Sequence, residues 1–433
     1  MTRHATGGQV VSWAFYDFAN SAFATVILAV VFNVYFVGTV CAGGVRLFGR
    51  VLPGESVWGL CVSASTLAVF LISPVLGAAA DVSGSKKSFL GFFCALGVLF
   101  TGLLFFSGPG GVLRSALCFI AANIGFAAGN TFYNALLNDV SGREDYGRVS
   151  GFGWALGYIG GGLALLLCLW FMSDPEAWGM AGDGTLPARS SFLAAAVWWG
   201  LFSLPVFLGV KESRARDSGF SLGSVREGFR RALATASRVR EHREVFKFLL
   251  AYVFYNDGIE TVIIMAAVFG SRVLGFAQKD LVLCFLLIQG VAFFGSLIFG
   301  RLADAAGHKR AISLSLWVFL AVCLWGAAIR TQAEFWVLGG LVGLVLGGSQ
   351  AASRSFLALL APAEKSAEFF GFFALTGKLS SVLGPLVFAV LAQTVSLRAA
   401  VAGLGGFFAL GLAILYFVRE PFAETHDPLQ QTV

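Results

Sequence analysis

Charged and amide side chains lie inside four long apolar runs of this sequence, where such side chains are rare. They are Asp17 and Asn20 in the first run, Asn130 and Asn134 in the fourth, Asn256, Asp257 and Glu260 in the seventh, and Gln350 and Arg354 in the tenth. A charge at the centre of a bilayer costs about 2.5–3.5 kcal/mol on insertion scales, so each one needs a partner or a water-filled cavity. Residues three or four apart share one face of a helix. These faces predict a polar ring around a pathway for a small solute or an ion.

Arg354 is the cation of this set, and its partner decides what the ring could do. We expect it to neutralise Asp257 or Glu260, or to bind a substrate carboxylate when the partner is protonated. A carboxylate that is removed from water binds a proton more readily, which would suit proton-coupled transport. The alternative is that the same residues form interhelical hydrogen bonds and one structural ion pair. Asp17 could also be a contact at the cytoplasmic end of its helix.

Several other chemistries have no matching pattern in the sequence. The four histidines, His4, His242, His308 and His426, all lie outside the apolar runs, which argues against a histidine relay or an intramembrane metal site. No Gly-x-x-x-x-Gly-Lys-Ser/Thr loop is present, so no ATP-driven motor is expected. The seven cysteines are scattered without a Cys-x-x-Cys pair, and we expect them to act as small apolar residues. The sequence predicts neither an enzyme nor a bound cofactor.

The elements that must position the polar residues are membrane helices. Hydrophobic residues make up 57% of the chain and charged residues 12%, about half the charged content of a soluble domain. Runs of about 20 apolar residues, enough to cross a bilayer, predict an all-α membrane protein with twelve spans. We expect them at about 11–38, 57–80, 89–107, 114–138, 149–172, 191–210, 246–269, 281–303, 311–328, 334–360, 369–392 and 398–418. The first run is too long for a cleaved signal peptide and is expected to stay.

The distribution of Lys and Arg predicts how the chain is oriented. Most of them fall in the loops on the side of the N-terminus, with the largest group in the connection 211–245. The positive-inside rule then places both termini in the cytoplasm, and we expect a multi-pass protein of the cell membrane. The net charge of +6 is thereby explained by topology, so nucleic acid is not an expected partner. The connection divides the chain into a six-helix bundle at 1–210 and a second bundle at 246–433.

Two readings of the connection 211–245 remain open. Leu222, Val225, Phe229 and Leu233 recur at helical spacing, while arginines occupy other positions. This pattern fits an amphipathic helix on the inner leaflet, and equally a linker whose basic face is in water.

The two halves repeat a loop motif. Gly77, Asp81, Gly84, Lys86 and Lys87 follow the second span, and Gly300, Asp304, Gly307, Lys309 and Arg310 follow the eighth, at a constant offset of 223 residues. Glycine permits a tight turn, a carboxylate can cap a helix N-terminus, and the cations can anchor at the inner interface. A weaker repeat relates Asn130 and Asn134 to Gln350 and Arg354, at an offset of 220. The motif predicts a pair of equivalent cytoplasmic turns.

These paired loops resemble the cytoplasmic signature of the major facilitator superfamily. The segment Trp13-Ala-Phe-Tyr-Asp-Phe-Ala-Asn-Ser-Ala-Phe23 is similar to the first-helix signature of the UMF1 and Atg22-like transporters. The segments 255–258, 348–355 and 369–372 fit the same family. The second loop departs from the pattern, because Asp304 is followed by Ala305-Ala306-Gly307-His308.

The resemblance implies a transporter that works by alternating access, with spans one, four, seven and ten around the cavity. It implies an inner gate in which Asp81, Lys86 and Lys87 pair across the halves. It also implies a secondary transporter that functions as a monomer, with amino acids as the favoured substrate and protons as a possible partner. Carriers of sugars, peptides or drugs, and a non-transporting receptor, are the alternatives.

Overall fold

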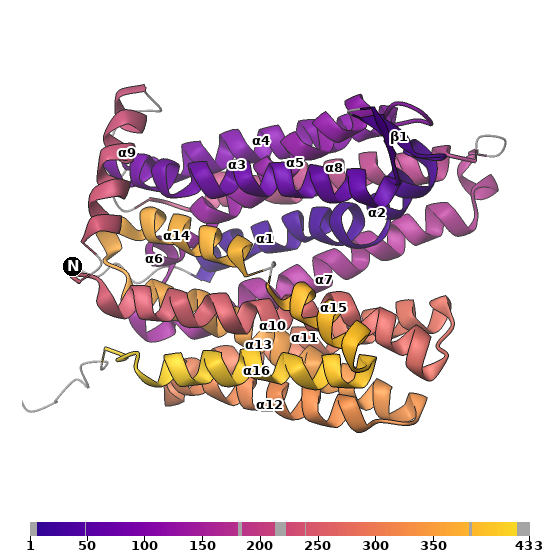
Figure 1. Cartoon of the computed structure of the whole chain (residues 1–433). Coiled ribbons are helices and arrows are strands. Elements are labelled where there is room, and N and C mark those ends of the chain that lie inside the picture. Colours follow the sequence, from indigo (N-terminus) through magenta and orange to yellow (C-terminus); the bar gives the residue numbers. More distant parts are fainter. Residues whose placement is uncertain are drawn as a thin grey trace, which may run out of the picture.

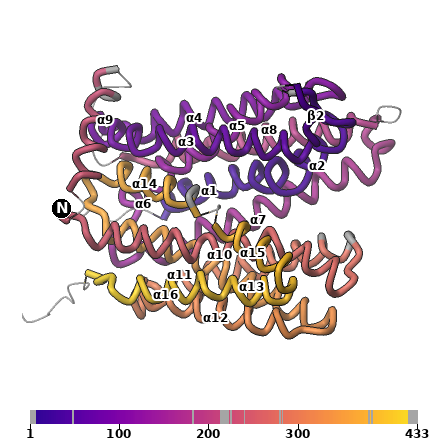
Figure 2. Tube along the Cα trace, in the orientation of Figure 1, coloured from indigo at the N-terminus to yellow at the C-terminus, as the bar shows by residue number. Residues whose placement is uncertain are grey.

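The computed structural model describes residues 7–47, 49–180, 184–212, 222–238, 240–380 and 383–421. Long helices run side by side through most of this chain (Figures 1 and 2). The strands of the described residues are β1 (Val45–Leu47) and β2 (Arg50–Leu52), which form an antiparallel hairpin after the first span. The all-α fold predicted from the sequence is therefore confirmed.

Six crossings precede the central connection. The first combines α1 (Gly7–Ala22), α2 (Phe32–Tyr35) and two π-helical stretches, η1 (Phe23–Val30) and η2 (Phe36–Val40). The next five are formed by α3 (Gly54–Ser83), α4 (Lys86–Leu103), α5 (Val112–Ala135), α7 (Tyr146–Ser173) and α8 (Leu186–Gly209), with the short α6 (Leu137–Val140) between α5 and α7. Short 3₁₀ turns occur at η3 (Leu104–Phe106), η4 (Arg143–Asp145) and η5 (Glu176–Trp178).

Six further crossings follow. They are formed by α10 (Arg243–Leu274), α11 (Gln278–Ala306), α12 (His308–Ala328), α13 (Gln332–Leu360), the pair α14 (Ser366–Leu379) and α15 (Leu383–Thr394), and α16 (Leu397–Tyr416), with a 3₁₀ turn η6 (Ala363–Lys365) before α14. Among the described residues, eleven helices are long and apolar enough to span a bilayer. The pair α14 and α15 supplies the twelfth crossing. Here the expectation of one continuous helix at 369–392 was wrong, because α14 ends at Leu379 and α15 begins at Leu383.

Local sequence explains several helix ends. Gly84 ends α3 in the left-handed conformation, with φ 64°, which costs glycine little. Thr331 begins α13 with a capping box, since its hydroxyl accepts from the Glu334 amide and the Glu334 carboxylate accepts from the Thr331 amide. Such ends keep the polar turns at the two ends of the bundle.

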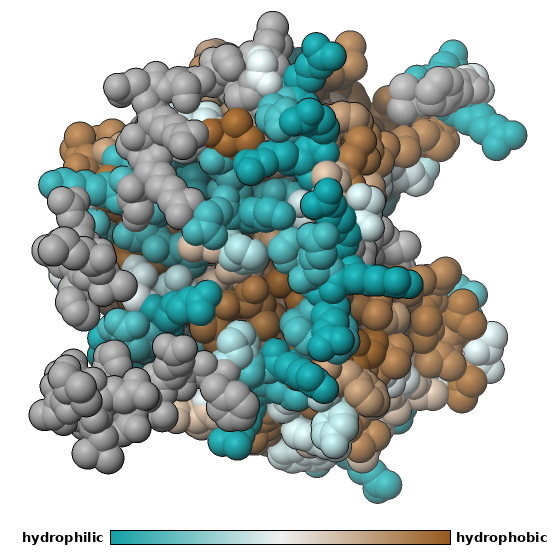
Figure 3. All heavy atoms as spheres, turned by 90° about the vertical axis from the view of Figure 1, so that its left-hand side faces the viewer, coloured by the Kyte–Doolittle hydropathy of each residue, from teal (hydrophilic) through white to brown (hydrophobic). Residues whose placement is uncertain are grey.

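Polar residues gather at the end of the molecule where α1 begins. Hydrophilic side chains cover much of this face in Figure 3, whereas apolar residues lie along the flanks. The connection between the halves contains α9 (Leu222–Ser237), which runs across the neighbouring helices at this end (Figure 1). The helical reading of the central connection is thus confirmed for these residues.

The helices of the two halves meet along two main contacts. α7 packs against α11 and α13, and α3 packs against α14. α7 also packs against α1 within its own half. Helices α3, α7, α11 and α14 therefore carry the contact between segments that are distant in the sequence.

Candidate transport site

Arg354 forms a buried ion pair with Asp17. Its Nη1 lies 2.8 Å from Asp17 Oδ2, and only 2% of the arginine is exposed. The expected pairing of Arg354 with Asp257 or Glu260 was wrong, because Asp17 on α1 occupies the guanidinium instead. Asp17 is also not a contact at the cytoplasmic end of its helix, since it lies ten residues after α1 begins at Gly7 and pairs with Arg354.

Other donors of Arg354 fix its orientation. Nε donates to Ser150 Oγ at 2.9 Å, Nη2 donates to the Ser150 carbonyl at 2.6 Å, and Nη1 reaches Asn134 Oδ1 at 3.3 Å. The arginine on α13 is thereby connected to α1, α5 and α7, which belong to the other half. A planar guanidinium suits several partners at once, whereas a lysine ammonium would not.

Three aromatic rings enclose the guanidinium. Its Cζ lies 4.8 Å from the ring centroid of Trp13, 5.6 Å from that of Tyr133 and 5.3 Å from that of Trp154. Cation–π attraction helps to offset the cost of burying the charge. Tyr133, Ser150 and Trp154 could not be assigned to the site from the sequence, because aromatic and hydroxyl residues are common in apolar helices. Their approach to Arg354 depends on tertiary packing.

A cavity of about 360 Å³ lies next to this ion pair. Its described lining contains no charged side chain, and is mostly aliphatic and aromatic. The polar exceptions with oxygen or nitrogen in the side chain are Ser21, Thr25, Trp154, Tyr158, Gln289 and Gln350. Tyr158 donates to Gln350 Oε1 at 2.5 Å, which joins α7 to α13. Because Gln350 lies one turn before Arg354 and Trp154 covers the guanidinium, these residues separate the cavity from the ion pair.

The cavity lies away from the end where α1 begins. On α10 its lining runs from Val262 to Phe269, in the second half of that helix, and on α13 from Phe335 to Gln350. The last ten residues of α13, which lead back to the polar end, do not line it.

The polar residues of α10 form a separate group, so the described side chains do not form one ring. Asp257 Oδ2 accepts from the Gly384 amide at 2.9 Å, at the start of α15. Its Oδ1 is buried and makes no hydrogen bond with the described residues. Asn256 Nδ2 donates to Ser380 Oγ at 2.6 Å, just after α14 ends. Both side chains therefore contact the interruption between α14 and α15.

The remaining predicted pathway residues are placed near these groups or between them. Asn20 Nδ2 donates to Asn130 Oδ1 at 2.7 Å, which joins α1 to α5 within one half. Glu260 is half-buried on α10, one turn after Asp257.

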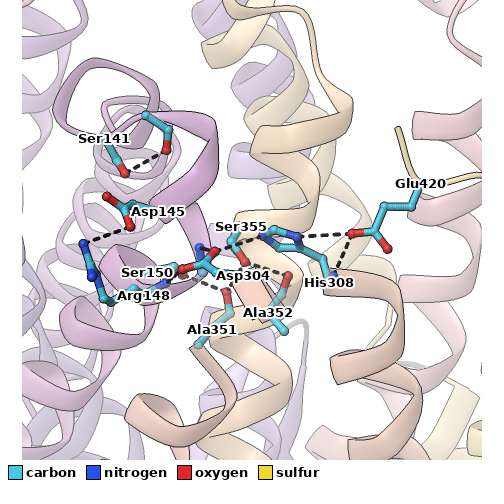
Figure 4. A network of polar contacts seen from close by, with 12 residues as sticks. Ser141, Asp145, Arg148, Ser150, Asp304, His308, Ala351, Ala352, Ser355 and Glu420 are labelled. Atoms are coloured by element: carbon cyan, nitrogen blue, oxygen red, sulfur yellow. Dashed lines mark hydrogen bonds and ion pairs between the residues drawn. The ribbon is translucent and has the colours of Figure 1, made fainter. Parts of the chain in front are cut away.

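Two aspartates connect the halves at the polar end. Asp81 accepts from the amides of Ala367 and Glu368, at 3.2 and 2.8 Å, at the start of α14. Asp304 accepts from the amides of Gly147 and Arg148, at 2.6 and 2.7 Å, at the start of α7 (Figure 4). Each carboxylate thus satisfies free amides at a helix N-terminus of the other half, where negative charge is favoured. We refer to these contacts of Asp81 and Asp304 as the latch.

Glycines permit the close helix approach at the latch. A Cβ atom on Gly77 would overlap the Ala367 carbonyl, and one on Gly300 would lie 2.6 Å from the Gly147 carbonyl oxygen. The glycine of each predicted motif therefore lies at the backbone-to-backbone contact that brings the following aspartate to its helix.

The lysines of the motif act within a half, so the expectation that they pair across the halves was wrong. Lys86 pairs with Asp139 at 2.9 Å, and Lys87 Nζ donates to the carbonyls of Phe207 and Val210 at 2.8 and 2.6 Å. In the second half, Lys309 Nζ donates to the carbonyls of Tyr416 and Val418 at 2.7 and 2.8 Å. Lys309 therefore corresponds to Lys87, and Arg310 is exposed.

The register of the repeat changes by one residue within the motif. α4 begins at Lys86 and α12 begins at His308, so the offset here is 222. The second turn, in which Gly307 has φ 103°, is one residue shorter than the first. His308 thus occupies the place of Lys86, and its Nδ1 lies 3.3 Å from Glu420 Oε1 (Figure 4).

Glu212 and Glu420 occupy equivalent places after the last crossing of each half. Glu212 accepts from the Lys87 amide at 2.5 Å, and Glu420 accepts from the His308 and Lys309 amides at 2.7 and 3.2 Å. Burial raises the pKa of Glu212 above its ordinary value of 4.5, and the hydrogen bond from Lys87 only partly opposes it. Burial also raises the pKa of Glu420, but the hydrogen bonds from His308 and Lys309 outweigh it and lower the pKa below 4.5.

Other kinds of site are not evident in the described part of the chain. No group of three or more His, Cys, Asp or Glu residues there could hold a metal ion. All seven cysteines are buried and unpaired, as expected for small apolar residues.

Comparisons with known proteins agree with this architecture. The family described as "Vacuole effluxer Atg22 like" matches residues 5–143 and 138–424. The uncharacterized MFS-type transporter YxiO of Bacillus subtilis is 35% identical over 415 residues, which cover 95% of each chain. Autophagy-related protein 22 of Yarrowia lipolytica is 26% identical over 302 residues, which cover 62% of this chain and 49% of that protein.

Solved structures show the same fold at low sequence identity. The proton:xylose symporter XylE matches with a TM-score of 0.72 at 14% identity, covering 95% of this chain and 96% of that chain. The human organic anion transporter MFSD10 matches with a TM-score of 0.67 at 15% identity, covering 94% and 99%. Twelve crossings, the paired latch and the family match together show that the chain belongs to the Atg22-like family of major facilitator transporters, and is not an enzyme.

Proposed function

We propose that the chain is a secondary transporter that carries a small solute, with amino acids as the favoured substrate, by proton-linked alternating access. In this proposal the bundles at 1–210 and 246–433 rock about the buried contacts between them, joined by the connection 211–245. The protein functions as a monomer in the cell membrane, with both termini in the cytoplasm.

The observation that carries the proposal is the asymmetry between the two ends. The latch of Asp81 and Asp304 joins the halves at the polar end, while the cavity lies in the other half of the bundle's length. The distribution of Lys and Arg supports a cytoplasmic location for the latched end. The arrangement is then a state closed to the inside, and its counterpart requires both aspartates to release their helices.

The cavity's chemistry supports a solute with a large apolar part. A sugar would need hydrogen-bonding partners for each hydroxyl, because unpaired polar groups are costly in a dry site. The described lining offers few, grouped around Tyr158 and Gln350. An amino acid could place its apolar side chain against the aliphatic lining and its polar end toward that group.

Asp257 is the favoured proton-binding residue. Asp17 is already paired with Arg354, whereas one oxygen of Asp257 is buried and makes no hydrogen bond in the described structure. A buried carboxylate with no counter-charge among the described side chains is stabilised by taking up a proton. Its contact with α15 would let protonation change how α14 and α15 sit on α10.

Flux in proteoliposomes tests the proposal. Uptake of a labelled amino-acid mixture is measured with and without an imposed pH gradient, for the wild type, Asp257→Asn and Glu176→Gln. We expect gradient-dependent uptake in the wild type and in Glu176→Gln, whose carboxylate is exposed in a loop, and loss of the dependence in Asp257→Asn.

The possible outcomes separate the parts of the proposal. Uptake that is independent of the pH gradient in every variant would contradict proton coupling but support transport. Binding without flux, in samples shown to be folded and inserted, would favour the receptor alternative. Flux of sugars or drug-like solutes in place of amino acids would change the substrate class only.

A further inference from the structure

α9 packs directly on the transmembrane helix α3. Gly228 is buried, and a Cβ atom there would lie 2.6 Å from the Val75 carbonyl oxygen and 2.7 Å from the Ala79 amide nitrogen. Ala232 and Thr235 are buried on the same side of α9. The central connection is therefore held against the bundle along this helix.

The contact lies at the depth of the lipid headgroups. α3 has 30 residues and is about 45 Å long, enough to cross a bilayer with its headgroup regions. Val75 and Ala79 come eight and four residues before its end at Ser83, or about 12 and 6 Å along the axis. α9 runs across this end of the bundle (Figure 1), so in a bilayer its outward side would lie at the level of the headgroups.

That side combines apolar and basic residues. Phe229 and Leu233 are 55% and 56% exposed, four residues apart. Arg226 and Arg230 are exposed on the adjoining strip, also four residues apart. We call these four residues the outer face of α9. Apolar side chains beside arginines at the headgroup level match the pattern of an interfacial helix bound to an anionic leaflet.

The same stretch of α3 carries the latch. Gly77 is two residues from both Val75 and Ala79, which places it on the opposite side of the helix. There it abuts Ala367 of α14, and Asp81 follows one turn later. α3 is thus held between α9 on one side and the latch helix on the other.

From this arrangement we infer that the outer face of α9 binds anionic phospholipid and that the bound lipid stabilises the closed latch. The acyl region receives Phe229 and Leu233, and the arginines contact the phosphates. Lipid that holds α9 in place also holds the inner end of α3 against α14. The inference rests on the proposed alternation for its second part only.

Depth measurements test the first part. A nitroxide is attached at Phe229→Cys or Ala234→Cys in a chain whose native cysteines are replaced, in nanodiscs. We expect the label at 229 to be exposed to oxygen and protected from a water-soluble nickel complex. The label at 234, which lies off the outer face, should show the reverse balance. Equal exposure of both labels to the nickel complex would overturn lipid contact.

Distances across the inner end test the second part. Spin labels at Arg143→Cys and Ala305→Cys, both exposed positions in opposite halves, are measured in phosphatidylcholine with and without phosphatidylglycerol. We expect phosphatidylglycerol to raise the closed population several-fold, and Arg226→Gln with Arg230→Gln to abolish that rise. The matched control, Arg238→Gln with Arg240→Gln, removes equal charge from the same connection outside α9 and should keep it.

The outcomes are distinct. Two distance populations whose proportions do not change with lipid charge would overturn the inference and leave the proposed function standing. A single distance in every lipid would overturn the alternation itself. An equal response of both double variants would show that general surface charge, and not the outer face of α9, senses the lipid.

Discussion

At the residue scale, the pair formed by Asp17 and Arg354 is the most demanding feature of the protein. Two buried charges lose their hydration, and their attraction repays that loss only when the remaining hydrogen bonds are satisfied. Here Ser150, Asn134 and three aromatic rings supply those contacts. The pair also joins the first helix of one half to the fourth helix of the other.

A double-mutant cycle tests that pairing. Arg354→Gln leaves the Asp17 carboxylate buried without its cation, and we expect it to lower the free energy of unfolding by about 3–5 kcal/mol. Asp17→Asn should lower it by a similar amount, because it leaves the Arg354 guanidinium buried without its anion. The double variant should lose much less than the sum, which thermal unfolding in detergent would measure. Strictly additive losses would show that the two charges do not interact.

At the residue level, the sequence shows which charged side chains lie in apolar runs, but it does not show which residues they contact. Charged residues in apolar runs are rare, so Asp17, Asp257 and Arg354 could be selected from the sequence. Their partners could not, because helical spacing fixes a face but not the neighbour across it. The sequence favoured Asp257 or Glu260 as the partner of Arg354, whereas the structure pairs it with Asp17.

At the element scale, the two halves share one contact, a glutamate that accepts from backbone amides at the start of a helix, but the pKa of that glutamate is shifted in opposite directions. Glu212 and Glu420 each accept a backbone amide at the start of a helix, α4 and α12 respectively. The pKa of Glu212 is raised by burial, while that of Glu420 is lowered by hydrogen bonds that outweigh burial. The ionised form is thus disfavoured by folding at Glu212 and favoured at Glu420.

These opposite shifts predict opposite pH dependence. Because the folded pKa of Glu420 is below its unfolded value, its stabilisation is present above about pH 4.5 and is lost as the pH falls through the folded pKa. Glu420→Gln should therefore unfold at a lower temperature than the wild type at pH 7, with the gap closing toward pH 4. Glu212 has the reverse sign, so the Glu212→Gln variant should gain stability relative to the wild type between pH 4 and 7. Thermal unfolding at both pH values measures this, and parallel curves for the two variants would contradict it.

Helix positions were predictable at this scale, but interruptions were not. Hydropathy reports the length of an apolar run. Residues 369–392 are apolar over most of their length, which suggests one helix. Near the end of α14, Asn256 of α10 contacts Ser380, and Asp257 of α10 accepts from the Gly384 amide; both are long-range contacts that hydropathy does not report. The shorter second turn was also not predictable. The repeat of Gly, Asp and Gly is visible in the sequence, but the contact of the His308 amide with Glu420 at the start of α12 is a long-range contact.

At the scale of the whole molecule, the closed end depends on backbone contact between α7 and α11. The Gly300 Cα faces the Gly147 carbonyl oxygen so closely that a methyl group would lie 2.6 Å from it. When a methyl group is added to an interior packed this tightly, whole helices must shift. Such overpacking lowers the free energy of unfolding by about 1–3 kcal/mol. In a two-state transporter, that cost falls on the closed state alone, because the contact is absent when the halves separate at this end.

Gly300→Ala should therefore shift the population toward the state open at the polar end, by roughly fivefold or more for a cost of this size. Spin labels at Arg143→Cys and Ala305→Cys would report the change as a longer distance across that end. Gly290→Ala is the matched control, since it lies on the same helix with no atom within 4 Å of its added methyl group. A shift of equal size in both variants would point to helix propensity as its cause. An unchanged distance in Gly300→Ala, with stability retained, would mean that α7 and α11 adjust locally and that this contact does not control the inner end.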